Sequence, residues 1–280
     1  MRVDQLGVDL YSWQKIALKW MSSQEEGPQR GGLLCDEMGL GKTVEAMSLV
    51  ALRPVKKTLI IVPPILIHQW MEWISKIDPY ARIYQNRPRD NHQWDREIQL
   101  LEKSNIVITG YMKLLGSRSV KVREQLPHLR KDISPLHEIY WDRIIVDECQ
   151  YLQSPKSQRT MAVLALKGTY RWGLTGTPFA KSPRQMSSIM RFLRWREGDL
   201  SGIEYNNQMS EIILSRRIVD IPELKDRMAK LTESLVKIDF SRDEAGLYFS
   251  IKGQLREKWL NRKSIRLPRW IRNKSYFLIQ

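Results

Sequence analysis

The feature that most constrains the fold is a series of short apolar stretches, each bounded by turn-forming or polar residues. They cover 57–64, 104–111, 141–148 and 169–178, and amphipathic helices are expected between several of them. Strands that are apolar throughout are typical of a parallel sheet with helices on both faces. The sequence therefore predicts an α/β fold with a doubly wound, mostly parallel sheet, whose ligands bind at the carboxyl ends of the strands.

The remaining elements follow from the same patterns. Helices are expected at 9–23, 43–52, 68–77 and from near Ser154, shorter strands at 32–35 and 81–86, and a polar loop at 87–95. Beyond residue 200 the pattern weakens: 206–227 is charged and irregular, 232–241 indicates a strand and 242–259 a helix. We expect a main lobe over 1–200, a linker of mixed α/β character over 201–251 and a basic tail over 252–280.

A glycine-containing loop joins an expected strand to an expected helix. Phosphate-binding loops have the pattern G-x-x-x-x-G-K-[ST]; Gly41, Lys42 and Thr43 match it, while Asp36 occupies the position of the first glycine. Gly39 and Gly41 permit a tight backbone turn. Lys42 is expected to reach the β- and γ-phosphates of a triphosphate, and Thr43 to bind Mg²⁺. The alternative is a glycine-rich turn with a surface lysine, but the flanking strand and helix favour a nucleotide site.

Two carboxylates end the apolar stretch "IIVDECQ". Asp147 is expected to hold Mg²⁺, and Glu148 to orient and deprotonate the attacking water. An acidic pair after a strand is, by itself, equally consistent with a solvated turn. Together with a phosphate loop it is the expected second half of an ATPase site.

Two further segments are candidates for the same site. The stretch "LTGTP", at another strand end, places Thr175, Gly176 and Thr177 where small residues are able to sense the γ-phosphate or bind the acidic pair. A plain turn is the simpler alternative. Gln14 lies beside an aromatic residue in the first helix, and its amide is able to read adenine; an exposed helix position is the alternative.

The balance of charge favours a polyanionic partner. The net charge is +15, and 252–280 contributes nine lysines and arginines against Glu257. A chain this basic usually meets nucleic acid, although a merely solvated basic surface is the alternative. The stretches "PPILIHQW" and "TGYMK" each follow an expected strand at the same edge of the sheet. These stretches and the basic tail supply the expected phosphate contacts. These candidates are Pro64, His68, Thr109, Tyr111, Lys263 and Arg266.

Several segments occur here in a characteristic order: Gln14, "DEMGLGKT", "LIIVPPILIHQW", "IVITGY", "WDRIIVDECQ" and "LTGTP". In this order they resemble the first motor lobe of the Swi/Snf-type DNA translocases of helicase superfamily two. The resemblance covers about 8–250, and 141–178 is most similar to the branch that includes RING-bearing post-replication-repair translocases. It implies a RecA-like P-loop domain that binds ATP and Mg²⁺. It also implies movement along double-stranded DNA without strand separation, often with remodelling of nucleosomes or removal of bound proteins.

The resemblance also assigns roles by position. It implies an adenine contact at Gln14, a nucleotide loop that includes Asp36, Mg²⁺ and water contacts at the acidic pair, and a coupling group. The coupling group is Gln150, Thr175, Gly176 and Thr177. Gln150 stands where the family usually has His, so we expect altered coupling rather than inactivity.

The family's second motor lobe, with its arginine finger, has no counterpart before Gln280, and no RING-type Cys/His cluster is found. We therefore expect this chain alone to bind ATP·Mg²⁺ and DNA weakly and to hydrolyse ATP slowly or not at all. The expected partners are duplex DNA, a second RecA-like lobe in cis or in trans, and nucleosomes or repair proteins.

Three functions remain open at this stage: the ATP-binding lobe of a DNA translocase, a catalytically inactive nucleic-acid-binding scaffold, and an ATPase that acts on protein. Cys35 and Cys149 are the only cysteines and cannot form a disulfide framework, which fits a reducing compartment. No apolar run approaches the ~20 residues of a membrane span, and no secretion signal is found. The expected location is the nucleus of a eukaryote, or otherwise the cytoplasm of a bacterium or of a virus-infected host cell.

Overall fold

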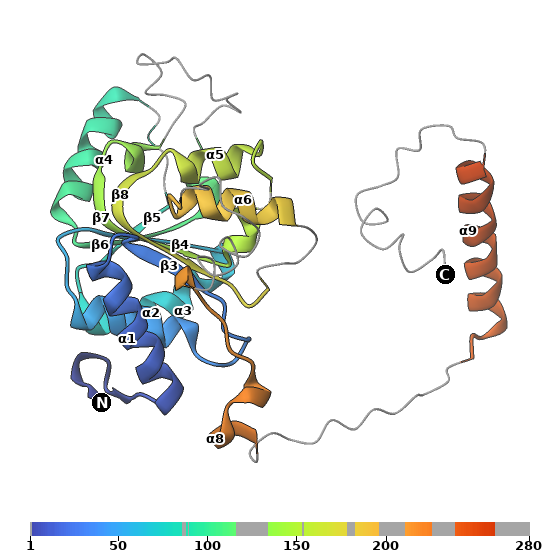
Figure 1. Cartoon of the computed structure of the whole chain (residues 1–280). Helices are drawn as coiled ribbons and strands as arrows, with labels where there is room; N and C mark the ends of the chain where they lie inside the picture. The colour runs from blue at the N-terminus through green and yellow to red at the C-terminus, as the bar shows by residue number, and fades with distance from the viewer. Residues whose placement is uncertain are drawn as a thin grey trace, which may run out of the picture. The chain divides into compact units, whose positions relative to one another are not determined.

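In the described part of the chain, seven parallel strands form the central sheet, in the order β5–β6–β4–β7–β8–β3–β9 (Figure 1). The computed structural model describes residues 2–85, 88, 90–115, 134–152, 154–177, 183–195, 211–225 and 239–260. The strands are β3 (Gly31–Leu34), β4 (Thr58–Val62), β5 (Arg82–Tyr84), β6 (Ile106–Gly110), β7 (Tyr140–Asp147), β8 (Lys167–Leu174) and β9 (Ile213–Leu214). The predicted parallel α/β fold is confirmed.

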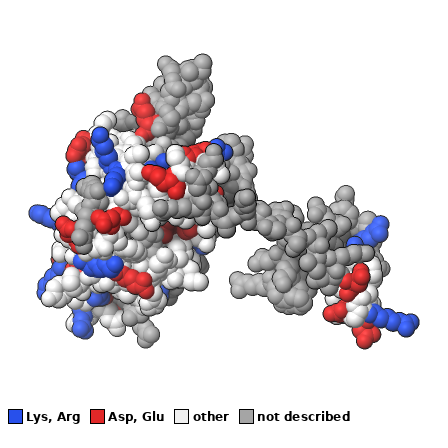
Figure 2. Space-filling model, turned by 90° about the horizontal axis from the view of Figure 1, so that it is seen from below, with Lys and Arg blue, Asp and Glu red and all other residues white. Residues whose placement is uncertain are grey.

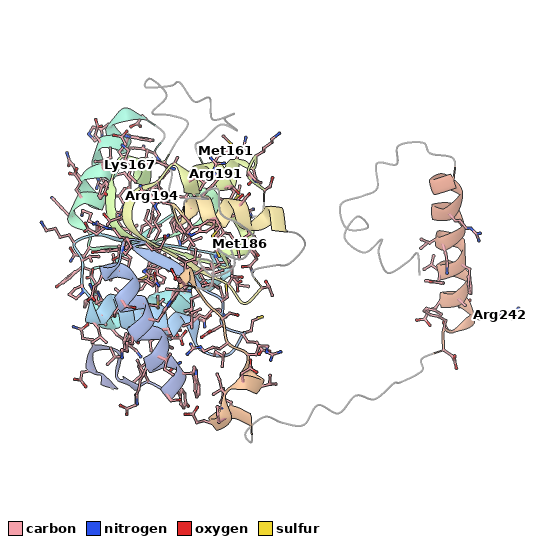
Figure 3. All side chains as sticks on the ribbon, viewed as in Figure 1. Met161, Lys167, Met186, Arg191, Arg194 and Arg242 are labelled. Atoms are coloured by element: carbon pink, nitrogen blue, oxygen red, sulfur yellow. The ribbon has the colours of Figure 1, made fainter. Side chains whose placement is uncertain are left out.

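Helices cover both faces of the sheet, as Figure 1 shows. One face packs against α1 (Ser12–Glu26), α2 (Lys42–Leu52) and α3 (Ile67–Ile77), and the other against α4 (Asn91–Lys103), α5 (Gln158–Leu164) and α6 (Pro183–Phe192). Alternate residues of one strand enter opposite cores, as a pleated strand requires. Leu59 and Ile61 contribute to the core under α4–α6, and Ile60 to the core under α1–α3. Met186, on α6, is a buried side chain of the first of these cores (Figure 3).

The smaller elements complete the described chain. They are the antiparallel pair β1 (Arg2–Val3) and β2 (Val8–Asp9), the short helix α8 (Pro222–Lys225), and 3₁₀ turns that include η3 (Tyr111–Leu114) and η5 (Cys149–Leu152).

The chain divides into two units, Met1–Met228 and Ala229–Gln280. The described part of the second unit is α9 (Arg242–Leu260) and the residues just before it. Among the described helices, no segment has both the length and the apolar character needed to cross a lipid bilayer.

The register of the strands aligns their carboxyl ends. Asp147 lies opposite Leu174, which lies opposite Leu34, and Leu34 lies opposite Leu214. The residues that follow β7, β8, β3 and β9 therefore leave the sheet side by side at one edge. Ligands of parallel α/β sheets bind at this edge.

Three parts of the sequence differ from what their patterns predict. The stretch 87–95, expected as a polar loop, contains the start of α4, whose N-cap Asp90 accepts a hydrogen bond from the Gln93 N–H at 2.8 Å. The stretch 206–227, expected to be irregular, supplies β9 to the sheet, which thus extends beyond residue 200. The helix expected from Ser154 begins at Gln158, because Ser157 caps it. The strand expected at 232–241 lies largely outside the described residues.

A buried ion pair joins the end of α1 to the sheet. Arg143, on β7, donates to both carboxylate oxygens of Glu25, at 2.6 and 2.7 Å, and both side chains are almost fully buried. The indole N–H of Trp172 donates to the same carboxylate at 3.0 Å. Since a buried charge is tolerated only when it is paired, each partner depends on the other.

We expect the replacement Glu25→Gln to lower the free energy of unfolding by about 3–5 kcal/mol, because it leaves the buried guanidinium of Arg143 unpaired. Urea denaturation measures this loss. The exposed pair of Arg217 and Asp220 provides the control, and Asp220→Asn should leave the denaturation midpoint unchanged. Equal denaturation midpoints for Glu25→Gln and the wild-type protein would contradict the stabilising role of the ion pair between Glu25 and Arg143.

Candidate functional site

The loop between β3 and α2 has the backbone of a phosphate cradle. Gly39 and Gly41 have φ angles of 93° and 94°, and α2 begins directly after Gly41. A Cβ at position 41 would lie 2.4 Å from Nε2 of Gln14, so this turn excludes any side chain. The first N–H groups of α2 have no intrahelical partners, and with the helix dipole they favour an anion in front of the loop.

The ammonium group of Lys42 lies within the curve of this loop. Its Nζ donates to the main-chain carbonyls of Asp36 at 2.6 Å and of Glu37 at 3.3 Å. These neutral acceptors are exchangeable for phosphate oxygens, which accept more strongly from a cation. Thr43, in the first turn of α2, is half-buried.

The three sequence segments expected to form one site do meet at the sheet edge. A Cβ at Gly176 would lie 3.5 Å from Nζ of Lys42 and 2.9 Å from Cγ of Met38, so the turn after β8 contacts the glycine loop. Asp147 lies opposite Leu174, the residue at the end of β8, in the register of the two strands. The glycine loop, the acidic pair and the "LTGTP" turn therefore meet at one edge of the sheet.

Asp147 is buried, and both oxygens of its carboxylate accept hydrogen bonds. Its carboxylate accepts hydrogen bonds from the indole N–H of Trp70 and from the N–H of Glu148, both at 2.9 Å. Burial raises the pKa of Asp147 to about 6, while the bond from Trp70 opposes this rise. The carboxylate is thus mostly ionised at neutral pH, which is the form that binds Mg²⁺, and its role as a ligand stays a prediction.

Glu148 has an unusual backbone. Its φ is 50°, in the left-handed region that residues other than glycine rarely adopt. Its carboxylate accepts a hydrogen bond from Nε2 of Gln150 at 2.5 Å. The Oε1 atom of Gln150 is buried and has no partner in the described part of the chain, so it can accept a hydrogen bond from a further group at the site.

The threonines of the "LTGTP" turn shape its backbone. Thr175 is fully buried, its N–H donates to the carbonyl of Leu34 at 3.0 Å, and its hydroxyl accepts from the Thr177 N–H at 3.0 Å. The turn is thereby fixed to the end of β3, where the glycine loop starts. This arrangement fits a coupling role for the turn, and that role stays a prediction.

Gln14 packs against the glycine loop instead of projecting from the helix into solvent. Its Nε2 donates to the carbonyl of Leu40 at 3.2 Å, and its Oε1 accepts from the N–H of Tyr11 at 3.1 Å. The rings of Tyr11 and Trp13 stack with centroids 4.4 Å apart. Each amide atom retains capacity for one more hydrogen bond, so adenine recognition by Gln14 stays a prediction.

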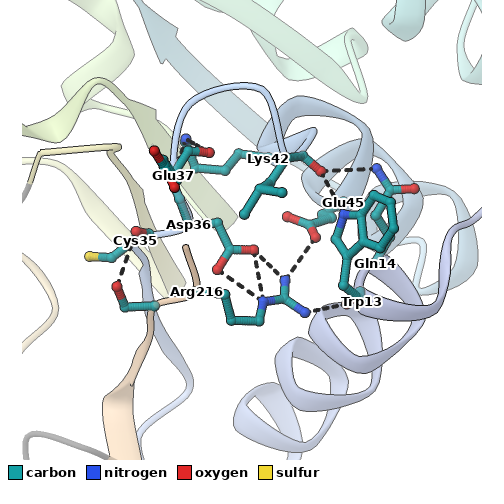
Figure 4. A network of polar contacts seen from close by, with 10 residues as sticks. Trp13, Gln14, Cys35, Asp36, Glu37, Lys42, Glu45 and Arg216 are labelled. Atoms are coloured by element: carbon teal, nitrogen blue, oxygen red, sulfur yellow. Dashed lines mark hydrogen bonds and ion pairs between the residues drawn. The ribbon is translucent and has the colours of Figure 1, made fainter. Parts of the chain in front are cut away.

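Arg216 is the residue of this site that the sequence patterns did not indicate. It follows β9, and Figure 4 shows its guanidinium bound to the carboxylate of Asp36, to Glu45 at 3.0 Å and to the main-chain carbonyl of Trp13. One side chain thus ties the glycine loop to α2 and α1. The carboxylate of Asp36 is fully buried in this pair, so Asp36 contributes to the shape of the loop and not, by its side chain, to nucleotide contacts.

The Arg216 cluster holds two carboxyls and one guanidinium. Burial and the charge of Asp36 raise the pKa of Glu45 to about 8, although Arg216 opposes the rise. Glu45 therefore keeps its proton at neutral pH. A signal for this cluster was present in the sequence, since Glu45 interrupts the apolar face of α2 and a buried carboxyl requires a partner.

The expected phosphate contacts at the neighbouring strand ends divide into two groups. Pro64 and His68 line a pocket with Ile67, Gln85, Gly110, Met112 and Lys113. Thr109 and Tyr111 are buried: Thr109 donates to the carbonyl of Tyr84 at 2.9 Å, and Tyr111 to that of Asp147 at 2.5 Å. Both hydroxyls therefore donate within the protein in this structure, and a contact of either residue with nucleic acid stays a prediction.

Charge on the described surface is mixed. Figure 2 shows lysine and arginine side chains interspersed with aspartate and glutamate on the face it presents. The described residues on that face form no continuous basic surface. The predicted contacts Lys263 and Arg266 lie outside the described residues.

A parallel sheet whose carboxyl edge carries a glycine loop, a lysine at a helix start and an acidic pair defines a P-loop nucleoside-triphosphatase of the RecA-like class. The chain belongs to the SNF2 branch of this class. The sequence model for the SNF2-related domain matches residues 13–237.

Individual relatives agree with this family. An uncharacterized ATP-dependent helicase of Schizosaccharomyces pombe is 33% identical over 197 residues, which are 66% of this chain and 19% of the relative. The DNA excision repair protein ERCC-6-like of Bos taurus is 26% identical over 245 residues, 84% of this chain and 18% of the relative. The chain thus spans about a fifth of the length of these relatives. The SWI2/SNF2 ATPase core of Sulfolobus solfataricus, solved with double-stranded DNA, has the same fold, with a TM-score of 0.62 and 23% identity over 95% of this chain and 56% of that one.

We expect the replacement Glu45→Gln to change the pH dependence of stability. The folded protein holds the Glu45 proton up to about pH 8, whereas a free glutamate loses it near pH 4.5. The stabilisation from this group is therefore complete below pH 4.5 and is lost as the pH rises to about 8. Urea denaturation gives the free energy of unfolding of the wild type and of Glu45→Gln at each pH. The value for the wild type minus that for the variant should fall by at most about 1.4 kcal/mol per pH unit across this window. A difference in the free energy of unfolding that is the same at all pH values would contradict the raised pKa of Glu45.

Proposed function

We propose that this chain is the ATP-binding lobe of an ATP-dependent DNA translocase and that it acts together with a second RecA-like lobe, in cis or in trans. The observation that carries the proposal is the meeting of Lys42, the acidic pair and Gly176 at one edge of a parallel sheet. Membership of the SNF2-related family supports ATP as the nucleotide.

The described residues fit a nucleoside triphosphate with Mg²⁺. A Cβ at Gly39 would contact nothing, so the loop is open there, and Lys42 offers a cation within the loop. Thr43 and Asp147 would hold Mg²⁺, and Gln14 would contact the base. When bound, Mg²⁺·ATP supplies the phosphoanhydride whose cleavage drives movement.

Glu148 would orient and deprotonate water near the γ-phosphate. Gln150 binds the same carboxylate, and Thr175 and Thr177 fix the turn that touches the loop. We propose that these residues pass the state of the nucleotide to the second lobe. An arginine finger from that lobe would contribute about 10³–10⁵ in turnover, so the lobe alone would be slow.

The pocket beside the site would bind the sugar–phosphate backbone of duplex DNA. Pro64, His68 and Lys113 line it, and the exposed ring of His68 and the cation of Lys113 are able to contact phosphates. The basic tail would add further phosphate contacts through Lys263 and Arg266. The name of the bovine relative supports a role in DNA repair. We also propose that the chain is related to the RING-bearing post-replication-repair translocases, because its residues 141–178 resemble that branch. A nuclear location would follow in a eukaryote, with nucleosomes or repair proteins as further partners.

One observation favours a second candidate, a scaffold that binds nucleic acid but does not hydrolyse ATP. Gln150 replaces the expected histidine, and its amide occupies one oxygen of the carboxylate that should activate water. Nucleotide binding would persist in such a scaffold while turnover would not. The two candidates therefore differ in hydrolysis and not in binding.

We expect Lys42→Ala to weaken the binding of a fluorescent ATP analogue with Mg²⁺ at least about tenfold, because the loop loses its cation. Glu148→Gln should still bind the analogue. It should lose any DNA-stimulated hydrolysis, because it changes the group that activates water. The exposed Lys56, in the loop before β4, is the control, and Lys56→Ala should bind like the wild type. Unchanged binding by Lys42→Ala would exclude the proposed site.

The DNA-stimulated ATPase assay on residues 1–280 separates the remaining alternatives. Slow turnover that Glu148→Gln abolishes supports the translocase lobe, and zero turnover with intact binding supports the scaffold. Turnover at the rate of a two-lobed translocase would contradict the need for a second lobe.

We expect Lys113→Ala to reduce the salt dependence of duplex binding by about one unit in the slope of log K against log salt, because one phosphate contact is lost. Fluorescence anisotropy at several salt concentrations gives this slope. The exposed Lys103, in the last turn of α4, is the matched control, and its replacement by Ala should leave the slope unchanged. Equal slopes for Lys113→Ala and the wild type would remove the pocket from the DNA interface.

A further inference from the structure

The main chain of the acidic pair is held by a tyrosine from the turn after β6, a strand separated from β7 by β4. The Tyr111 hydroxyl donates to the carbonyl of Asp147 at 2.5 Å and lies 3.3 Å from that of Glu148. The Glu148 carbonyl also accepts from the Tyr151 N–H at 3.0 Å. Glu148 has a positive φ, and residues in this region keep that conformation only when their surroundings hold it.

The ring of Tyr111 is fixed independently of its hydroxyl. It lies 5.6 Å from the ring of Tyr151, and the guanidinium of Arg159 is 5.8 Å from its centre. Burial raises the pKa of Tyr111 well above its ordinary value, so the hydroxyl stays protonated and remains a donor. Removal of the hydroxyl alone thus removes the brace and retains the packing.

The segment that carries Tyr111 also forms one wall of the proposed DNA pocket. Gly110, Met112 and Lys113 line this pocket, while Tyr111, between them, is buried against the acidic pair. Adjacent residues of one short 3₁₀ turn thus face two different sites. A displacement of this turn at the pocket moves the hydroxyl that holds Glu148.

The opposite wall has the same construction. Ile67 and His68, at the start of α3, line the pocket, and Trp70, two residues beyond His68, donates its indole N–H to the Asp147 carboxylate at 2.9 Å. Trp70 is almost fully buried. Each of these two segments that line the pocket therefore carries a residue that binds the acidic pair. Tyr111 binds its main chain, and Trp70 binds the side chain of Asp147.

We infer that Tyr111 and Trp70 are positioning residues that couple occupancy of the pocket by the backbone of duplex DNA to the geometry of Asp147 and Glu148. The element with two states is the peptide backbone at Glu148, which is left-handed when Tyr111 holds it and is free to relax when Tyr111 is displaced. DNA in the pocket fixes the turn and so fixes the carboxylates that bind Mg²⁺·nucleotide. The inference rests on the proposed function, since it assumes that the two sites bind these ligands.

The test compares the affinity of residues 1–280 for a non-hydrolysable fluorescent ATP analogue with Mg²⁺, without and with saturating duplex DNA. The ratio of the two affinities measures the coupling, and coupled sites usually show a factor of about 5–150. We expect a ratio in this range for the wild type and a ratio near one for Tyr111→Phe. A general loss of stability does not produce this result, because it acts on both affinities that form the ratio.

Matched variants complete the test. Trp70→Phe should also lower the ratio, whereas Trp141→Phe removes a buried indole that donates to the carbonyl of Leu136, remote from the acidic pair. Tyr140→Phe removes a hydroxyl at the opposite end of β7, where its partner is Thr169. Both controls should keep the wild-type ratio.

The outcomes separate the inference from the proposed function. A wild-type ratio of one, or an unchanged ratio in Tyr111→Phe, overturns the coupling while binding of each ligand upholds the proposed function. Failure of the wild type to bind either ligand overturns both.

Discussion

The parallel register of four strands is the constraint on which the site depends. Because Asp147, Leu174, Leu34 and Leu214 lie in one row across β7, β8, β3 and β9, the segments after them start at the same height. Residues that are far apart in sequence then meet without long loops. A shift of one residue in any of these strands would turn its side chains to the opposite core and remove its terminal residues from the row.

Charge compensation is the second requirement of the structure. Two buried acidic positions, Glu25 and Asp36, are each paired with an arginine from a distant part of the chain, Arg143 and Arg216. The first pair attaches α1 to the sheet, and the second attaches the glycine loop to β9. Such pairs contribute little net stability compared with apolar residues of similar size, but they allow few alternative arrangements of the elements they join.

The sequence predicted the sheet and the nucleotide loop because their signals are local. Apolar strands such as 58–62 and the spacing of Gly41, Lys42 and Thr43 are visible within a few residues. The strand β9 has two residues, and Arg216 lies 180 positions from Asp36, so no local pattern connects them. The burial of Thr109 follows from the apolar character of β6, which is covered on both faces. The burial of Tyr111, in the turn after β6, depends on its distant acceptor at Asp147, which no local pattern shows.

The attachment of Arg216 has a consequence for the order in which the lobe forms during synthesis. The ribosome adds about 5–20 residues per second, so roughly 10–40 s separate the emergence of Asp36 from that of Arg216. During this interval the strands β4 to β8 are made, but the nascent chain still lacks the cation that pairs with Asp36 in the glycine loop. The nucleotide cradle, which is encoded near the start of the chain, is therefore among the last parts of the lobe to reach its final structure.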